Sequence, residues 1–97
     1  MKNENLKELL SCGVVYKNHN DSCATSQINS LALEVLEYFR AEGYVVTLQD
    51  ETTPEGDSEY SGELYRIGSE HRTNMFLEIE TWASQGCGQV KLFTLGN

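Results

Sequence analysis

Residues 25–42 read TSQINSLALEVLEYFRAE, and this stretch decides the fold. Its apolar residues recur at three- and four-residue spacing, which places them along one side of an α-helix. Gly43 follows at the position where a left-handed residue commonly ends a helix, and Tyr44 can then pack back on the last turn. The stretch therefore predicts an amphipathic helix with a buried stripe formed by Ile28, Leu31, Ala32, Val35, Leu36 and Phe39.

Strand patterns follow this helix and alternate with short turn-rich segments. Runs rich in β-branched and aromatic residues occupy residues 44–49, 63–67, 75–82 and 89–95. Connections this short favour an antiparallel meander over parallel crossovers. Upstream of the helix, residues 6–10 suit a short helix and residues 14–16 suit a further strand.

These elements predict an α+β fold for the chain of 97 residues, which is a length suited to one small domain. The main helix, at about residues 25–42, is expected to pack on an antiparallel sheet of four to five strands. The sheet residues expected against its stripe are Val46, Leu48, Leu77, Ile79, Val90 and Leu92.

The strand at residues 75–82 (MFLEIETW) alternates cleanly between apolar and mixed positions. If its aliphatic residues point toward the helix, then Phe76, Glu78, Glu80 and Trp82 point away from it. These four residues are covered by the N-terminal segment 6–10, covered by a second copy of the chain, or left open as an interaction surface.

The charge of the chain is concentrated in one region. The net charge is −8, and residues 41–65 contain seven acidic residues and no Lys or Arg. Such a surface repels phosphate groups, which disfavours direct binding to nucleic acid and to anionic membranes. The N-terminus lacks the apolar run of a signal peptide, and three widely spaced cysteines do not form a secreted disulfide framework, so we expect a cytoplasmic location.

The densest part of this region is LQDETTPEGDSEYSGE, residues 48–63. As a loop from Asp50 to Gly62 it is long for a hairpin connection, and long loops are often functional or disordered. It is either a solvated loop or the surface that meets a partner. The predicted partner-binding residues are Asp50, Glu51, Glu55, Asp57, Glu59, Tyr60 and Glu63, together with Phe76, Glu78, Glu80 and Trp82.

Catalytic and metal chemistry finds little support in the sequence. Cys23 near the start of the main helix, with His71 from the following sheet, is the arrangement that papain-like thiol hydrolases use, but the likeness stops at these residue types. Cys12, His19 and Cys23 lack compact metal-ligand spacing, and the acidic stretch misses the calcium-loop pattern. No phosphate-binding motif occurs, so no cofactor is predicted.

In size, charge and lack of catalytic motifs, the chain resembles small phage and mobile-element proteins that block host nucleases, including anti-CRISPR proteins and other nucleic-acid mimics. The likeness is one of physical type and implies a non-enzymatic inhibitor that occludes the basic, nucleic-acid-binding surface of a partner protein, such as a host defence nuclease. The alternatives are an immunity protein that neutralises a nuclease toxin, a small thiol enzyme using Cys23, and a structural subunit of an oligomer.

Overall fold

A computed structural model describes residues 4–17, 24–52, 59–68, 75–82 and 85–94 of the chain. The elements are the helices α1 (Glu4–Cys12) and α2 (Ala24–Ala41), and the strands β1 (Val14–Lys17), β2 (Val45–Thr52), β3 (Tyr60–Gly68), β4 (Met75–Trp82) and β5 (Cys87–Thr94). They confirm the predicted α+β fold, with one main helix packed on a five-stranded antiparallel sheet.

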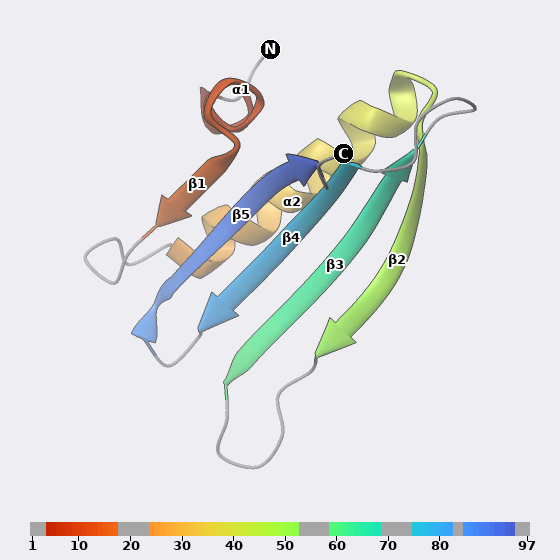
Figure 1. Cartoon of the computed structure of the whole chain (residues 1–97). Coiled ribbons are helices and arrows are strands. Elements are labelled where there is room, and N and C mark those ends of the chain that lie inside the picture. Colours follow the sequence, from red (N-terminus) through yellow and green to blue (C-terminus); the bar gives the residue numbers. More distant parts are fainter. Residues whose placement is uncertain (1–3, 18–23, 53–58, 69–74, 83–84, 95–97) are drawn as a thin grey trace.

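The sheet has the strand order β1-β5-β4-β3-β2, and every neighbouring pair is antiparallel. Strands β2 to β5 form the expected meander, and β1 adds to the far side of β5. Helix α2 connects the two edge strands and lies behind the sheet in the view of Figure 1. Figure 1 therefore shows the side of the sheet that is turned away from α2. We call this side the outer face.

Helix α2 ends as its sequence predicts. Gly43 has a φ of 95°, which is a conformation that glycine adopts without strain. The Tyr44 N–H donates to the Phe39 carbonyl (3.0 Å), and the Gly43 N–H donates to the Arg40 carbonyl (3.1 Å). The Tyr44 ring packs edge-on against the Phe39 ring, with centroids 5.4 Å apart, so the chain turns directly from α2 into β2.

The core lies between the sheet and the two helices. All six residues of the predicted helix stripe are buried, as are Leu77, Ile79 and Val90 of the sheet. Val46 and Leu92 are partly buried against this cluster. Leu48 does not fit the prediction, because it is 45% exposed on the edge strand β2 next to a β-bulge.

Helix α1 packs into this core and does not cover the outer face. Leu6 and Leu9 are buried and belong to the same cluster as Val15, Ile28 and Leu31. The N-terminal segment is therefore excluded as the cover of the outer face among the described residues, because its apolar side is already used on the helix side of the sheet.

The strands extend further into the acidic region than predicted. Strand β2 continues to Thr52, and β3 begins at Tyr60. Tyr60, Ser61 and Gly62 pair with residues of β4, and this pairing outweighs the weak strand propensity of Ser61 and Gly62. The predicted long loop from Asp50 to Gly62 is wrong at both ends, and its residues 53–58 lie outside the described part of the chain.

Candidate interaction surface

The register of the sheet assembles the outer face from all five strands, and β2 to β5 supply the polar residues of its two central rows. One row across it contains Asp50, Leu64, Glu78 and Lys91. The next row contains Thr52, Gly62, Glu80 and Gln89. Carboxylates from two separate segments, β2 and β4, therefore meet on one face of the sheet.

A β-bulge in β2 decides which acidic residue reaches this face. The pairing shifts between Leu48 and Asp50, so Gln49 has no partner in the β3 register. Side chains alternate along a strand, and one extra residue moves all later ones to the opposite face. Asp50 is therefore in the row of Leu64 and Glu78, whereas Glu51 is opposite Glu63 on the helix side.

Glu80 is the centre of a hydrogen-bond network on the outer face. Its Oε1 accepts a hydrogen bond from Gln89 Nε2 (2.7 Å), and its Oε2 accepts one from Tyr60 Oη (2.8 Å). Glu78, two residues earlier on β4, forms an ion pair with Lys91 (3.9 Å) whose side chains are about two-fifths exposed. Both oxygens of Glu80 thus accept hydrogen bonds from Gln89 and Tyr60, whereas Glu78 has a long ionic contact with Lys91 and a hydrogen bond with Glu80 itself.

These surroundings shift the pKa values of the Glu78 and Glu80 carboxyl groups in opposite directions. Burial alone would raise the pKa of Glu80, but the hydrogen bonds from Gln89 and Tyr60 outweigh it and lower that pKa. Burial and the charge of Glu80 raise the pKa of Glu78. Burial and the hydrogen bond to Glu80 raise the pKa of Tyr60 to about 12. Glu80 consequently keeps its charge to lower pH than an ordinary glutamate, because its pKa is lowered, whereas Glu78 takes up a proton at higher pH, because its pKa is raised.

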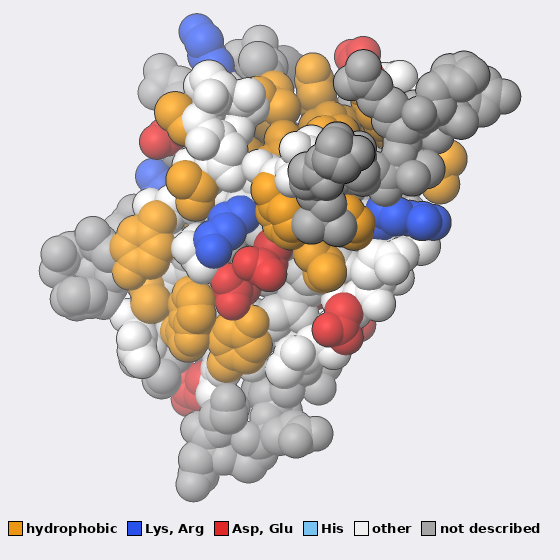
Figure 2. Space-filling view, in the orientation of Figure 1, with side chains coloured by type: hydrophobic (Ala, Val, Ile, Leu, Met, Phe, Trp, Pro, Cys, Tyr) orange, Lys and Arg blue, Asp and Glu red, His pale blue; other side chains and the backbone are white. Residues whose placement is uncertain are grey.

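Aromatic pairs flank the two acidic rows, one pair on each side along the strand direction. The rings of Phe76 and Phe93 stack with centroids 5.7 Å apart, and those of Tyr60 and Trp82 are 5.4 Å apart. Phe76 and Trp82 are six residues apart on β4, which corresponds to roughly 20 Å. Figure 2 shows hydrophobic, acidic and basic side chains side by side on this face.

Gly62 leaves room for Tyr60 to reach Glu80. A Cβ atom at position 62 would lie 2.6 Å from Tyr60 Oη, which is closer than real Cβ contacts come. The Tyr60 ring therefore lies over Gly62. A shallow hollow of about 100 Å³ is lined here by Asp50, Glu51, Thr52, Tyr60, Gly62, Glu63, Leu64, Glu78 and Glu80.

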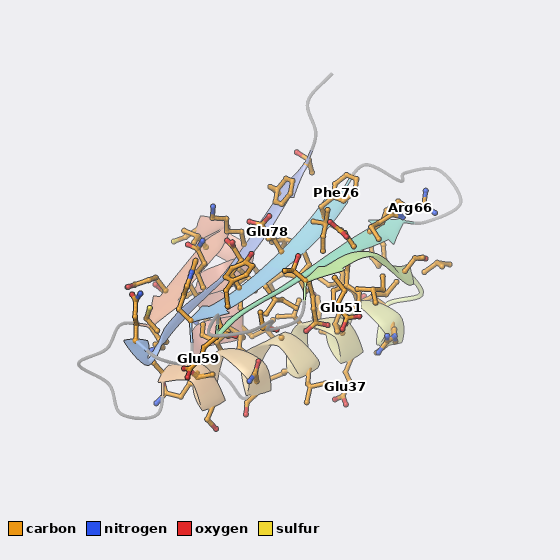
Figure 3. The ribbon with its side chains drawn as sticks, turned by 90° about the horizontal axis from the view of Figure 1, so that it is seen from below. Glu37, Glu51, Glu59, Arg66, Phe76 and Glu78 are labelled. Atoms are coloured by element: carbon orange, nitrogen blue, oxygen red, sulfur yellow. The ribbon has the colours of Figure 1, made fainter. Side chains whose placement is uncertain are left out.

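The structure divides the predicted partner-binding residues into four groups. The outer face holds Asp50, Tyr60, Phe76, Glu78, Glu80 and Trp82. Glu51 and Glu63 are on the helix side, where Glu63 accepts a hydrogen bond from Tyr65 Oη (2.6 Å). Glu59 is exposed just before β3, and Glu55 and Asp57 lie outside the described residues. Figure 3 shows Phe76 and Glu78 on the side of the sheet opposite to α2, with Glu51 toward the helix.

Gln89 and Leu64 belong to the outer face, but they are not among the partner-binding residues predicted from the sequence. Gln89 donates a hydrogen bond to Glu80 because the β4–β5 register places the two residues opposite each other. Leu64 shares a row with Asp50 because the bulge shifts the β2–β3 register. The alternation of β3 would have placed Leu64 on the outer face once its neighbours in the sheet were known.

The residues considered for thiol and metal chemistry remain largely untested. His19, Cys23 and His71 lie outside the described residues. Cys12 is exposed and Cys87 is buried. The GCG run at residues 86–88 suggests a tight turn carrying Cys87, but Cys87 begins β5 opposite Trp82 and the turn falls at Gly86. No group of three or more metal-ligating side chains occurs among the described residues.

Comparison with protein-family models, with curated proteins and with solved structures finds no match to this chain. Within the described part of the chain, neither helix is long and apolar enough to span a membrane.

Proposed function

We propose that this protein is a small, acidic, non-enzymatic binding protein that occludes a basic, nucleic-acid-binding surface of a partner protein, in the manner of phage anti-defence proteins. One observation carries the proposal: the sheet register and the β2 bulge bring Asp50 together with Glu78 and Glu80 on the outer face, against which the described helices do not pack.

The spacing of these carboxylates suits recognition of a basic surface. Glu78 and Glu80 are two residues apart on one strand, or roughly 7 Å, and Asp50 is two strands from Glu78, or roughly 10 Å. These separations are comparable to the Debye length at physiological salt, so the charges act jointly on an approaching cation. In the two acidic rows, Lys91 is the basic residue that the structure describes.

The aromatic pairs extend this surface beyond charge alone. Interface cores are enriched in aromatic residues, and an aromatic face attracts the cation of Lys or Arg. Phe76 and Trp82 are each half-buried by their neighbours and still partly accessible. A partner that places basic side chains on the acidic rows can therefore also bury the aromatic pairs on either side of those rows.

The test compares two variants with the same change in charge. The face variant carries Asp50→Asn and Glu78→Gln. The control variant carries Glu37→Gln and Glu42→Gln, both of which are exposed on or beside helix α2. Glu80 stays unchanged in both, because its hydrogen bonds contribute to folding.

We expect the wild type and the control variant to capture a basic nucleic-acid-binding protein from host lysate, and to prevent the purified partner from binding DNA or RNA. The face variant should lose both activities while its circular dichroism spectrum stays that of the wild type. Equal loss in the two variants, or capture of no basic protein by the wild type, would refute the proposal. The identity of the captured protein separates a defence nuclease from a toxin.

A further inference from the structure

Strand β2 leaves one long side of the sheet open. It is an edge strand, and among the described residues only β3 pairs with it. Seven of its eight residues are exposed, including Val45 at 68% and Leu48 at 45%. An edge strand presents backbone N–H and C=O groups that can pair with another strand.

One backbone N–H group of β2, that of Glu51, is paired with a side chain and not with a neighbouring strand. The Glu51 N–H donates to the Asp50 carboxylate of the same strand (2.9 Å). A side chain thus supplies an acceptor of the kind that a neighbouring strand would supply. An incoming strand can replace this acceptor, which leaves the Asp50 carboxylate to bind a cation.

The side chains of β2 specify what kind of strand fits. Residues 45–52 read VVTLQDET and contain no Lys or Arg. The bulge places Asp50 on the outer face and Glu51 on the helix side. Val45 is on the outer face and Leu48 is on the helix side. Each face of the edge therefore offers one apolar and one acidic side chain to the neighbouring strand.

The same features argue against a second copy of this chain as the occupant. Two β2 strands side by side would bring four carboxylates to one edge without a basic residue on either strand, in a protein of net charge −8. The opposite edge, β1, is only four residues long and carries Lys17, so it is a poor site for a basic strand.

We propose that the free edge of β2 binds an extended, lysine- or arginine-bearing segment of the partner as an additional strand of the sheet. The basic residues of that segment meet Asp50 and Glu51, and its apolar residues meet Val45 and Leu48. This mode of recognition is β-strand addition, in which main-chain hydrogen bonds give affinity and side chains give specificity. The inference rests on the proposed function and specifies how part of the partner is held.

The probe is a synthetic eight-residue peptide of sequence Lys-Lys-Val-Thr-Thr-Val-Thr-Thr. Its two valines lie on opposite faces of the strand, as Leu48 and Val45 do on β2. Its binding is followed by amide chemical shifts of the ¹⁵N-labelled protein. We expect shifts along Val45–Thr52 and not along β1. A peptide of the same sequence with N-methyl groups at alternate positions cannot complete the hydrogen-bond ladder and should bind at least about tenfold more weakly.

Substitution of Glu51 distinguishes binding at the β2 edge from binding on the outer face. Its side chain is on the helix side, so only a strand beside β2 meets both Glu51 and Asp50. We expect Glu51→Gln and Asp50→Asn each to weaken peptide binding by about threefold. Glu37→Gln removes one exposed charge from the helix side and should leave binding unchanged.

Two results would overturn the inference. One is the absence of any β2 shift up to the solubility limit of the peptide. The other is binding that ignores both N-methylation and Glu51→Gln but is lost in the Glu78→Gln variant. The second result would leave the proposed function standing on the outer face alone, whereas failure to capture any basic protein would remove the proposed function itself.

Discussion

Replacing Glu80 by glutamine should destabilise the fold, whereas the same replacement at Glu78 should not. The two positions are two residues apart on the same face of β4, and each substitution removes one negative charge. Glu80 accepts hydrogen bonds from Gln89 (2.7 Å) and Tyr60 (2.8 Å) on its two oxygens. Glu78 has a 3.9 Å ion pair with Lys91 and lies beside the charge of Glu80.

The magnitudes follow from these contacts. A glutamine at position 80 keeps one acceptor oxygen and turns an NH₂ group toward the other donor, so it loses at least one charge-assisted hydrogen bond. Such bonds contribute about 1.5–3 kcal/mol when buried, and partial exposure reduces the expected loss to about 1–2 kcal/mol. An exposed ion pair contributes about 0–1 kcal/mol, and Glu78→Gln also removes the repulsion from Glu80, so its net effect should stay within about 0.5 kcal/mol of zero.

Urea unfolding at neutral pH measures both effects. For a domain of this size the slope is about 1–1.5 kcal/mol per molar urea, so Glu80→Gln should lower the midpoint by about 1 M. The difference should depend on pH in a defined direction. Folding lowers the pKa of Glu80, so its contribution is present above the ordinary value of 4.5 and disappears as the pH falls through the lowered value. Folding raises the pKa of Glu78, so its ionised form opposes folding as the pH rises through the raised value.

Equal midpoints for the two variants at neutral pH would refute this reasoning, and so would a larger loss for Glu78→Gln. A Glu80→Gln effect that persists unchanged at about pH 3, where carboxylates are mostly protonated, would show that its cause is not the charged hydrogen bonds.

Three further predictions concern the rest of the fold. Tyr60 and Tyr65 should ionise near pH 12 because burial and hydrogen bonds to neighbouring glutamates raise their pKa values, so stability should fall between about pH 10 and 12; a single tyrosinate absorbance transition near 10 in the folded protein would contradict this. Leu9→Ala, at a fully buried position of α1, should lower the free energy of unfolding by about 2–5 kcal/mol, whereas Leu33→Ala, which is 64% exposed, should change it by less than about 1 kcal/mol; equal effects in urea unfolding would show that α1 is not docked in the core. Gly88→Ala should lower the free energy of unfolding by about 1–3 kcal/mol, because its Cβ would lie 2.8 Å from a backbone oxygen of β4 and 3.2 Å from a side chain of α2. An unchanged thermal midpoint would count against this close packing.

The elements that could be predicted from the sequence are those in which one pattern dominates. Residues 75–82 alternate without interruption, and β4 spans those same residues. The three- and four-residue spacing from Ile28 to Phe39 predicted α2 within one residue at each end, and Gly43 marked its end. In these stretches local preference and tertiary burial favour the same structure.

The acidic side of the sheet could not be predicted because its strands form by pairing. Asp50, Glu51, Ser61 and Gly62 have weak strand propensity, and they are extended because neighbouring strands supply partners. The bulge at Gln49 then decides which carboxylates share a face, and nothing in the local sequence marks it. Without the bulge, Asp50 would point toward α2 and Glu51 would join Glu78 on the outer face.

The stability of the fold does not explain the charge at position 78. Burial and the neighbouring Glu80 both raise the pKa of Glu78, so at neutral pH its ionised form works against folding. Glutamine would keep the strand geometry without this cost. Under the proposed function this carboxylate is one of the charges that bind the basic partner, so Glu78→Gln separates the contribution of position 78 to stability from its contribution to binding. We expect Glu78→Gln to maintain or raise the urea midpoint and to weaken capture of the basic partner in the same protein. A variant that loses stability and keeps full capture would reverse it.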